Sequence, residues 1–450
     1  MRIARWVVGI LGGLVLLALL AVLTVTVFVD PNRFRGQIER RVTRLTGQPF
    51  DIKGDLRISW WPWFALTTGP SEFGRAEGAD GQPIVQWQSA RVGAQLVPLL
   101  KGQLVVDTIR LEGAQVRLVR HADGTSNWDP VLAAFRNKPA EPEPVPTPGE
   151  APPPGAQIGG FQLRDGALTY VDERPGSAAN VAVSKWNLDI GEWRAGSTFP
   201  VETQLSLTVG QSFRAENMKV NTRLHVSDDA NDFDLFGLDF SSQIHAQPLP
   251  AAGLPVEFEV SRMAVRLSPL DVAISELSSH ISSLRLVTSI QAGEMGADKT
   301  LYVRGPIDLQ VPSVRDSLKL FGVDPPLPLD KGTLGEMKLK SMLEWQAGAI
   351  QATAIDLTLD ETHFNGELSR TAEEKPLWSF TLHGDKIGLG RYLSIEEKSK
   401  EPFELPVKAL KALRAQGELT FEQAWVGETK MHGVRLRLEM ADGKVRTASK

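Results

Sequence analysis

"FDIKGDLRISWWPWFALTTG", residues 50–69, is the stretch that indicates most clearly how this chain folds. Ile52, Leu56 and Ile58 alternate with polar residues, which is the pattern of a strand with one apolar and one solvated face. Trp60 continues the apolar face, whereas Trp61 and Trp63 point to the other face around Pro62, which cannot donate to a ladder. The stretch therefore predicts a β-strand that ends in an aromatic cluster.

The same two-residue period continues almost to the C-terminus. It is found in Val92, Ala94, Leu96; Ile109, Leu111; Val116, Leu118; Trp186, Leu188, Ile190; Leu205, Leu207, Val209; Val256, Phe258, Val260; Leu284, Leu286, Ile290; Ile307, Leu309, Val311; Ile355, Leu357, Leu359; and Val434, Leu436, Leu438. Strands with a single apolar face are typical of antiparallel sheets, because parallel strands are usually apolar on both faces. We therefore predict a mainly β protein.

One internal repeat stands out among these strands. Ile109, Leu111, Val116 and Leu118 recur 52 residues later as Phe161, Leu163, Leu168 and Tyr170. Each set is divided by "EGA" or "RDGA", which indicates a turn. The repeat predicts two copies of a hairpin in an extended, additive sheet.

Helices are predicted to be few. "DPVLAAF", 129–135, and "SVRDSLKLFG", 313–322, carry helix-starting residues and one apolar face each. A third covers 30–47, with Asp30 as cap, Pro31 in the first turn and Gly47 at the end. Its arginines give it a basic face, for which contact with anionic headgroups and plain solvation beside a packed apolar stripe are equally supported. The membrane-interface candidates are Arg33, Arg35, Arg40, Arg41, Arg44, Trp61 and Trp63.

Residues 6–29 contain no charged side chain and follow a five-residue tail, 1–5. As a helix they would extend ~36 Å, enough to cross a bilayer. A cleaved signal peptide is the alternative, but its apolar region is usually shorter. Its cleavage site is marked by small residues, and the candidate Ala18-Leu19-Leu20-Ala21 is a poor one that lies inside the apolar run. We predict a transmembrane anchor. The arginines after it favour a cytoplasmic C-terminal side, although long domains are translocated largely regardless of charge.

"KPAEPEPVPTPGEAPPPGA", within 138–157, predicts an extended linker because its prolines prevent strand pairing. It separates a domain at 30–137, with an amphipathic helix and a sheet, from an extended antiparallel sheet domain at 158–450.

Composition and motifs limit the kinds of chemistry that this chain could carry out. The chain has 450 residues, no cysteine and a net charge of -5, which excludes disulfides and thiolate catalysis and gives no reason to expect nucleic acid as a partner. Its seven histidines are scattered, and no phosphate-binding loop or nucleophile elbow is recognisable. We predict no cofactor, no metal site and no catalytic residue. A carboxylate pair formed in space is the one enzymatic alternative that stays open.

The chain resembles the AsmA family of bacterial envelope proteins. The resemblance rests on Asp30-Pro31-Asn32 after the apolar segment, Thr46-Gly47, "IKGDLRISWWPW", and a "DG" turn followed by Asn127-Trp128; beyond residue 136 it is looser. It implies an inner-membrane anchor followed by a periplasmic, elongated and curved antiparallel β-sheet groove that is apolar inside, similar to chorein-type bridge-like lipid-transfer proteins. Family members continue past "GKVRTASK", so the chain is expected to be either a fragment or a shortened member.

The implied function is non-enzymatic binding of phospholipid acyl chains, in support of lipid transport to the outer membrane or of its homeostasis and assembly. Membrane phospholipids are the expected partners, and outer-membrane or periplasmic envelope proteins are candidates. The groove candidates are Ile52, Leu56, Ile58, Trp60, Val92, Leu96, Ile109 and Leu111. The alternative is a scaffold or regulator of outer-membrane protein assembly that binds no lipid.

Overall fold

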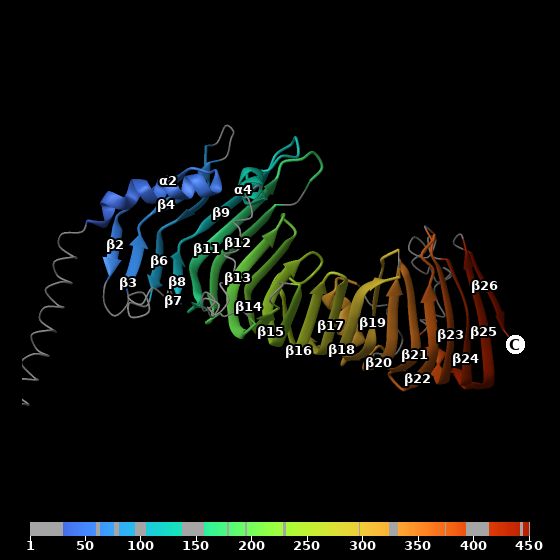
Figure 1. Cartoon of the computed structure of the whole chain (residues 1–450). Helices are drawn as coiled ribbons and strands as arrows, with labels where there is room; N and C mark the ends of the chain where they lie inside the picture. The colour runs from blue at the N-terminus through green and yellow to red at the C-terminus, as the bar shows by residue number, and fades with distance from the viewer. Residues whose placement is uncertain are drawn as a thin grey trace, which may run out of the picture. The chain divides into compact units, whose positions relative to one another are not determined.

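The structure is a computed structural model, and it describes residues 30–59, 64–75, 81–94, 105–136, 157–177, 180–193, 196–227, 231–296, 298–323, 332–373, 375–392, 414–441 and 444–449. These residues form 26 strands and a few short helices, which confirms the predicted mainly β class (Figure 1). The chain divides into two compact units, Met1–Met218 and Lys219–Lys450, which are described separately.

Several predictions fall outside the described residues: the anchor at 6–29, Trp60, Trp61, Trp63, Leu96 and nearly all of the linker at 138–157. Within the part of the chain that the structure describes, no helix combines the length and the apolar character needed to span a bilayer.

The first unit begins with the predicted amphipathic helix. Asp30 accepts a hydrogen bond from the Asn32 N–H at 2.9 Å, a short 3₁₀ turn η1 (Pro31–Phe34) leads into α2 (Arg35–Thr46), and Gly47 ends α2 at φ 69°, which glycine adopts without strain. Another helix is α4 (Asp129–Arg136), which confirms the helix predicted at 129–135.

The strands of this unit are β1 (Phe50–Ile52), β2 (Leu56–Ser59), β3 (Phe64–Thr68), β4 (Ser71–Arg75), β5 (Pro83–Trp87), β6 (Ser89–Ala94), β7 (Val105–Val106), β8 (Ile109–Glu112), β9 (Gln115–Arg120), β10 (Gln157–Ile158), β11 (Phe161–Asp172), β12 (Val181–Ile190) and β13 (Thr198–Val209). Strand β14 (Phe213–Val226) contains the division between the units.

The first strands are long strands interrupted near the middle. β1 and β2 are separated by 53–55, β3 and β4 by 69–70, β5 and β6 by Gln88, and β8 and β9 by 113–114. The backbones meet closely at the interruption: a Cβ on Gly54 would lie 2.7 Å from the Cα of Gly69. The paired rows Ile52–Ser71–Trp87 and Leu56–Thr68–Ala90 lie on either side of it. In the first strand three residues, 53–55, lie opposite two, 69–70, which is a β-bulge with one extra residue; across the other interruptions the register continues unchanged.

Helix α2 closes the free edge of the first long strand. Asn32 Oδ1 accepts from the Leu56 N–H at 2.9 Å, Glu39 Oε1 accepts from the Ile52 N–H at 2.9 Å, and Arg35 Nη2 donates to the Gly54 carbonyl at 2.7 Å. Side chains spaced three to four residues apart on the helix thus satisfy backbone groups spaced two apart on the strand. An edge that would otherwise be open to another chain is covered.

The 52-residue repeat has a different structural meaning from the one predicted. Phe161, Leu163, Leu168 and Tyr170 of β11 are the direct partners of Ile109, Leu111, Val116 and Leu118 in parallel pairing. Neither copy is a hairpin: β8 and β9 run in line along β11, and the "EGA" and "RDGA" segments are mid-strand irregularities. The hairpin prediction was wrong because glycine at a bulge and glycine at a turn give the same local sequence pattern.

In the second unit the strands are β15 (Asp232–Ala246), β16 (Leu254–Leu267), β17 (Leu270–Ile281), β18 (Leu284–Met295), β19 (Thr300–Val311), β20 (Met337–Gln346), β21 (Ala349–Leu359), β22 (Thr362–Arg370), β23 (Leu377–Gly388), β24 (Arg414–Val426), β25 (Thr429–Ala441) and β26 (Lys444–Ser449). Two short helices accompany them, α5 (Val314–Leu320), as predicted and capped by Ser313, and α6 (Leu389–Tyr392).

Pairing is antiparallel nearly throughout, as predicted, with exceptions. β7–β10, β8–β11 and β9–β11 in the first unit, and β23–β24 in the second, pair in parallel. Each parallel pair joins strands that are separated by a long connection, since parallel neighbours cannot be joined by a tight turn.

Candidate functional site

A single row of side chains crosses the sheet of the second unit. Residues directly opposite each other in neighbouring strands point to the same face, so the pairing defines the row. This central row, from β15 to β25, consists of Phe240, Phe258, Ser279, Leu286, Leu309, Leu339, Leu357, Phe364, Gly384, Phe421 and Val434. Nine of these eleven positions are large apolar residues, so an apolar row crosses one face of the sheet.

Gly384 is one of the two positions without a large side chain, and neighbouring rings fill the space there. At Gly384 the rings of Phe364 and Phe421 approach edge to face, 5.8 Å between centroids, and a Cβ on Gly384 would lie 2.7 Å from Phe421 Cδ1. At the start of the row Phe240 and Phe258 stack at 4.4 Å. Aromatic pairs of these geometries add stability beyond the area they bury.

The opposite face is polar. The row one residue along from the central row consists of Asp239, Glu259, Ser278, Val287, Asp308, Lys340, Asp356, Asn365, His383, Thr420 and Arg435. Ion pairs cross this row, such as Lys340 to Asp308 at 3.6 Å. The contrast between adjacent rows shows that the two faces of this unit meet different surroundings.

The described residues cover the apolar face only in part. Most side chains of the central row are half-buried, and Val303 and Leu343, which lie farther along β19 and β20 on the same face, are 39% and 38% exposed. Helices α5 and α6 contain 7 and 4 residues. A seven-residue helix extends only about 10 Å, whereas twelve paired strands extend about 50 Å across the sheet. A surface of this kind is suited to an elongated apolar ligand.

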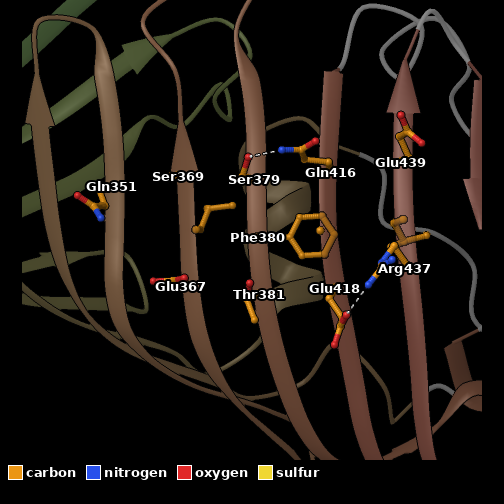
Figure 2. Close-up of a pocket in the computed structure, with 13 residues that line it drawn as sticks. Gln351, Glu367, Ser369, Ser379, Phe380, Thr381, Gln416, Glu418, Arg437 and Glu439 are labelled. Carbon is orange, nitrogen blue, oxygen red and sulfur yellow. Dashed lines mark hydrogen bonds and ion pairs between the residues drawn. The ribbon is translucent and has the colours of Figure 1, made fainter.

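The polar face carries a hollow of about 610 Å³, shown in Figure 2. It is lined mainly by polar side chains from β21 to β25, among them Glu367, Ser379, Gln416 and Arg437. Arg437 lies 3.5 Å from Glu418, which also pairs with Arg435 at 3.3 Å. In the described part of the chain no group of three or more histidine or carboxylate side chains is placed to hold a metal ion. The hollow is a solvated part of the polar face.

The predicted groove residues of the first unit occupy two environments. Ile52 and Leu56 are 3% and 2% exposed and pack with Phe50 under Ile38 and Val42 of α2. They are core residues that α2 shields from any ligand. Figure 1 shows α2 lying over the first strands.

The other predicted positions lie farther along the same face. Ile58 and Val92 both pair with Leu66, and Val92 is 45% exposed. Ile109 and Leu111 are half-buried, and Leu111 pairs with Leu163 of β11. These four residues share one apolar face, part of which is exposed at Val92.

The predicted interface arginines also separate into two groups. Arg35 faces the sheet, where it bonds the Gly54 carbonyl and lies 3.8 Å from Asp55. Arg33, Arg40, Arg41 and Arg44 are exposed.

The "DG" turn and Asn127-Trp128 serve the fold. The side chain of Asn127, 7% exposed, accepts from the Val119 N–H at 3.0 Å and donates to the Arg117 carbonyl at 2.8 Å. Trp128 packs on Tyr170, 6.0 Å between ring centroids. The motif fixes the loop that leads from β9 into α4.

Reasoning from the sequence missed the central row as a site. The signal was present in the long alternating segments after residue 230, but alternation alone does not reveal which strands are neighbours, so no continuous row could be assembled from it.

Comparison with known proteins shows the family to which the chain belongs. The pattern of the AsmA family matches residues 1–421. The chain is 31% identical over 109 residues to "Protein AsmA" and 30% identical over 150 residues to "AsmA family protein YhjG", both of Escherichia coli K12. These alignments cover 24% and 30% of this chain but only 17% and 21% of the relatives. Because the family pattern covers most of its length, the chain belongs to the AsmA family.

Proposed function

We propose that this protein binds phospholipid acyl chains along the apolar face of its sheet and supports lipid transport to, or homeostasis of, the bacterial outer membrane. The observation that carries the proposal is the central row, which offers an apolar surface through eleven consecutive strands. A headgroup would stay in water while its acyl chain lies on the row. The protein acts without catalysis.

The energetics suit a carrier. Burying an acyl chain gains about 0.8 kcal/mol for each methylene removed from water. A chain leaving a bilayer exchanges one apolar environment for another, so its net free-energy change is much smaller than this sum. Uptake and release are then both feasible, and a half-open face permits lateral movement.

The 24-residue stretch at 6–29 supports an inner-membrane anchor with the sheet units in the periplasm. Such an anchor would hold the apolar face near a source of phospholipid.

The test is native mass spectrometry of the full chain released gently from membranes. We expect bound phospholipid in the unmodified protein and its loss in the double variant Leu286→Asn, Leu309→Asn, which makes adjacent positions of the central row polar. The matched control is Val287→Asn, the next residue of the same strand, which lies in the polar row. It should keep its lipid.

A chemical denaturation midpoint measured on each variant separates loss of binding from loss of folding. An unmodified protein that is folded and empty would overturn the proposal and favour a lipid-free scaffold. Equal lipid loss in both variants would show that the central row is not the binding surface.

A further inference from the structure

Among the described residues, no hydrogen bond or ion pair ties the outward side chains Arg40, Arg41 and Arg44 of α2 to the rest of the fold. Its inward side chains are used: Ile38 and Val42 pack on the core, and Glu39 bonds the Ile52 N–H. Glu39 is the only acidic residue in α2. Because Glu39 is turned to the strand, the charged side chains on the outward face of α2 are all positive.

Four arginines supply that charge. Arg33, Arg40, Arg41 and Arg44 are exposed, and no acidic side chain of the described residues forms an ion pair with Arg40, Arg41 or Arg44. Three of them lie within five consecutive residues: Arg40 and Arg44 lie on the side of the helix away from Ile38, and Arg41, three residues after Ile38, lies at the edge of that side. A cationic face that the fold leaves unneutralised is suited to anionic groups supplied from outside.

Two large apolar side chains border the same face. Phe34 is 48% exposed and Leu45 is 51% exposed. They lie eleven residues apart, about three turns of helix, so they project on similar sides with Arg41 between them. Exposed apolar residues beside arginines are typical of helices that lie in a membrane interface.

We propose that this basic face, Phe34 with Arg33, Arg40, Arg41, Arg44 and Leu45, lies on the anionic surface of a phospholipid bilayer. The guanidinium groups bind lipid phosphates, and Phe34 and Leu45 enter the boundary between headgroups and acyl chains. The inference extends the proposed function by naming the surface that orients the first unit at the membrane. A nucleic acid is disfavoured, because it offers nothing to Phe34 and Leu45 and the chain as a whole carries a charge of -5.

The chain has no cysteine, so Gln37→Cys, on the exposed side of α2, creates a single labelling site. The full chain carrying an environment-sensitive fluorophore there is reconstituted into vesicles of phosphatidylcholine alone or mixed with phosphatidylglycerol. We expect a shift of emission to shorter wavelength and reduced quenching by acrylamide only in the anionic vesicles. High salt should weaken both effects. The variant Arg40→Gln, Arg41→Gln, Arg44→Gln should lose them.

No change in anionic vesicles, or an equal change in both vesicle types, would overturn the inference. A shift produced by an added oligonucleotide but not by anionic lipid would assign the face to a soluble polyanion and overturn it as well. The bound phospholipid of the triple arginine variant is measured in parallel and should be unchanged. Failure of this inference is thus distinct from failure of the acyl-chain proposal.

Discussion

At the scale of single residues, Asn32 of the Asp30-Pro31-Asn32 motif holds the edge of the first strand. Its side chain accepts from the Leu56 N–H at 2.9 Å and also from Arg35 Nη2 at 3.1 Å. Asn32→Ala would leave a backbone donor of the edge strand unsatisfied, at a cost of about 1–3 kcal/mol. We expect faster hydrogen exchange at the Leu56 amide in the intact chain, measured by mass spectrometry or NMR.

Gln37→Ala is the control for this change, because Gln37 lies on the exposed side of the same helix. Its exchange at Leu56 should match that of the unmodified protein. Unchanged protection in Asn32→Ala would mean that water replaces the side chain and that α2 does not secure the strand edge.

At the scale of elements, much of the fold is predictable from two-residue periodicity and helix caps. The strands around Val256, Leu284, Ile307 and Ile355, and the helix capped by Ser313, are where their patterns place them. Which strands pair with one another is harder to predict from the sequence. The 52-residue offset is the register of β8 and β9 against β11, a parallel pairing across a long connection, and local sequence contains no information on which strand returns to lie beside another.

A glycine within a strand makes a second prediction possible. Gly384 of β23 allows Phe364 of β22 and Phe421 of β24 to meet, and an added Cβ would lie 3.2 Å from the ring of Phe364 and 2.7 Å from that of Phe421. Gly384→Ala should therefore destabilise the second unit by about 1–3 kcal/mol, the usual cost of overpacking. The measurement is the thermal unfolding midpoint, with exchange in β22–β24 as a local readout.

Gly390→Ala is the comparison, since the nearest atom to a Cβ added at Gly390 is the backbone nitrogen of Gly427 at 3.7 Å, and α6 favours alanine. It should be neutral or slightly stabilising. Equal effects of the two substitutions would mean that backbone freedom, rather than the aromatic contact, determines the cost at Gly384.

At the scale of the whole molecule, the sequence predicts that an apolar face exists but not which residues form it. An apolar face was expected at Ile52 to Leu111, yet α2 covers Ile52 and Leu56, while the central row lies in the second unit. A helix that covers a strand face is invisible in the alternation of that strand. Which apolar positions stay open therefore depends on tertiary packing that the sequence pattern does not encode.

If lipid moves along the central row, one charge in its middle should block passage without emptying the face. Leu309→Arg places a guanidinium on the apolar face at β19, between Phe258 on β16 and Val434 on β25. These flanking positions lie about 14 and 29 Å from β19 across the sheet, beyond the reach of one arginine. Photo-crosslinking residues at Phe258 and Val434 would report lipid on each side. In cells we expect lipid adducts to be lost at one of the two positions and kept at the other, because supply comes from one end.

Purified Leu309→Arg protein loaded with excess phospholipid should give adducts at both positions, which shows that each side can still bind. Val287→Arg, in the polar row opposite Asp308, is the control and should leave both adducts intact in cells. Undiminished adducts at both positions in Leu309→Arg cells would show that the row stores lipid without conducting it.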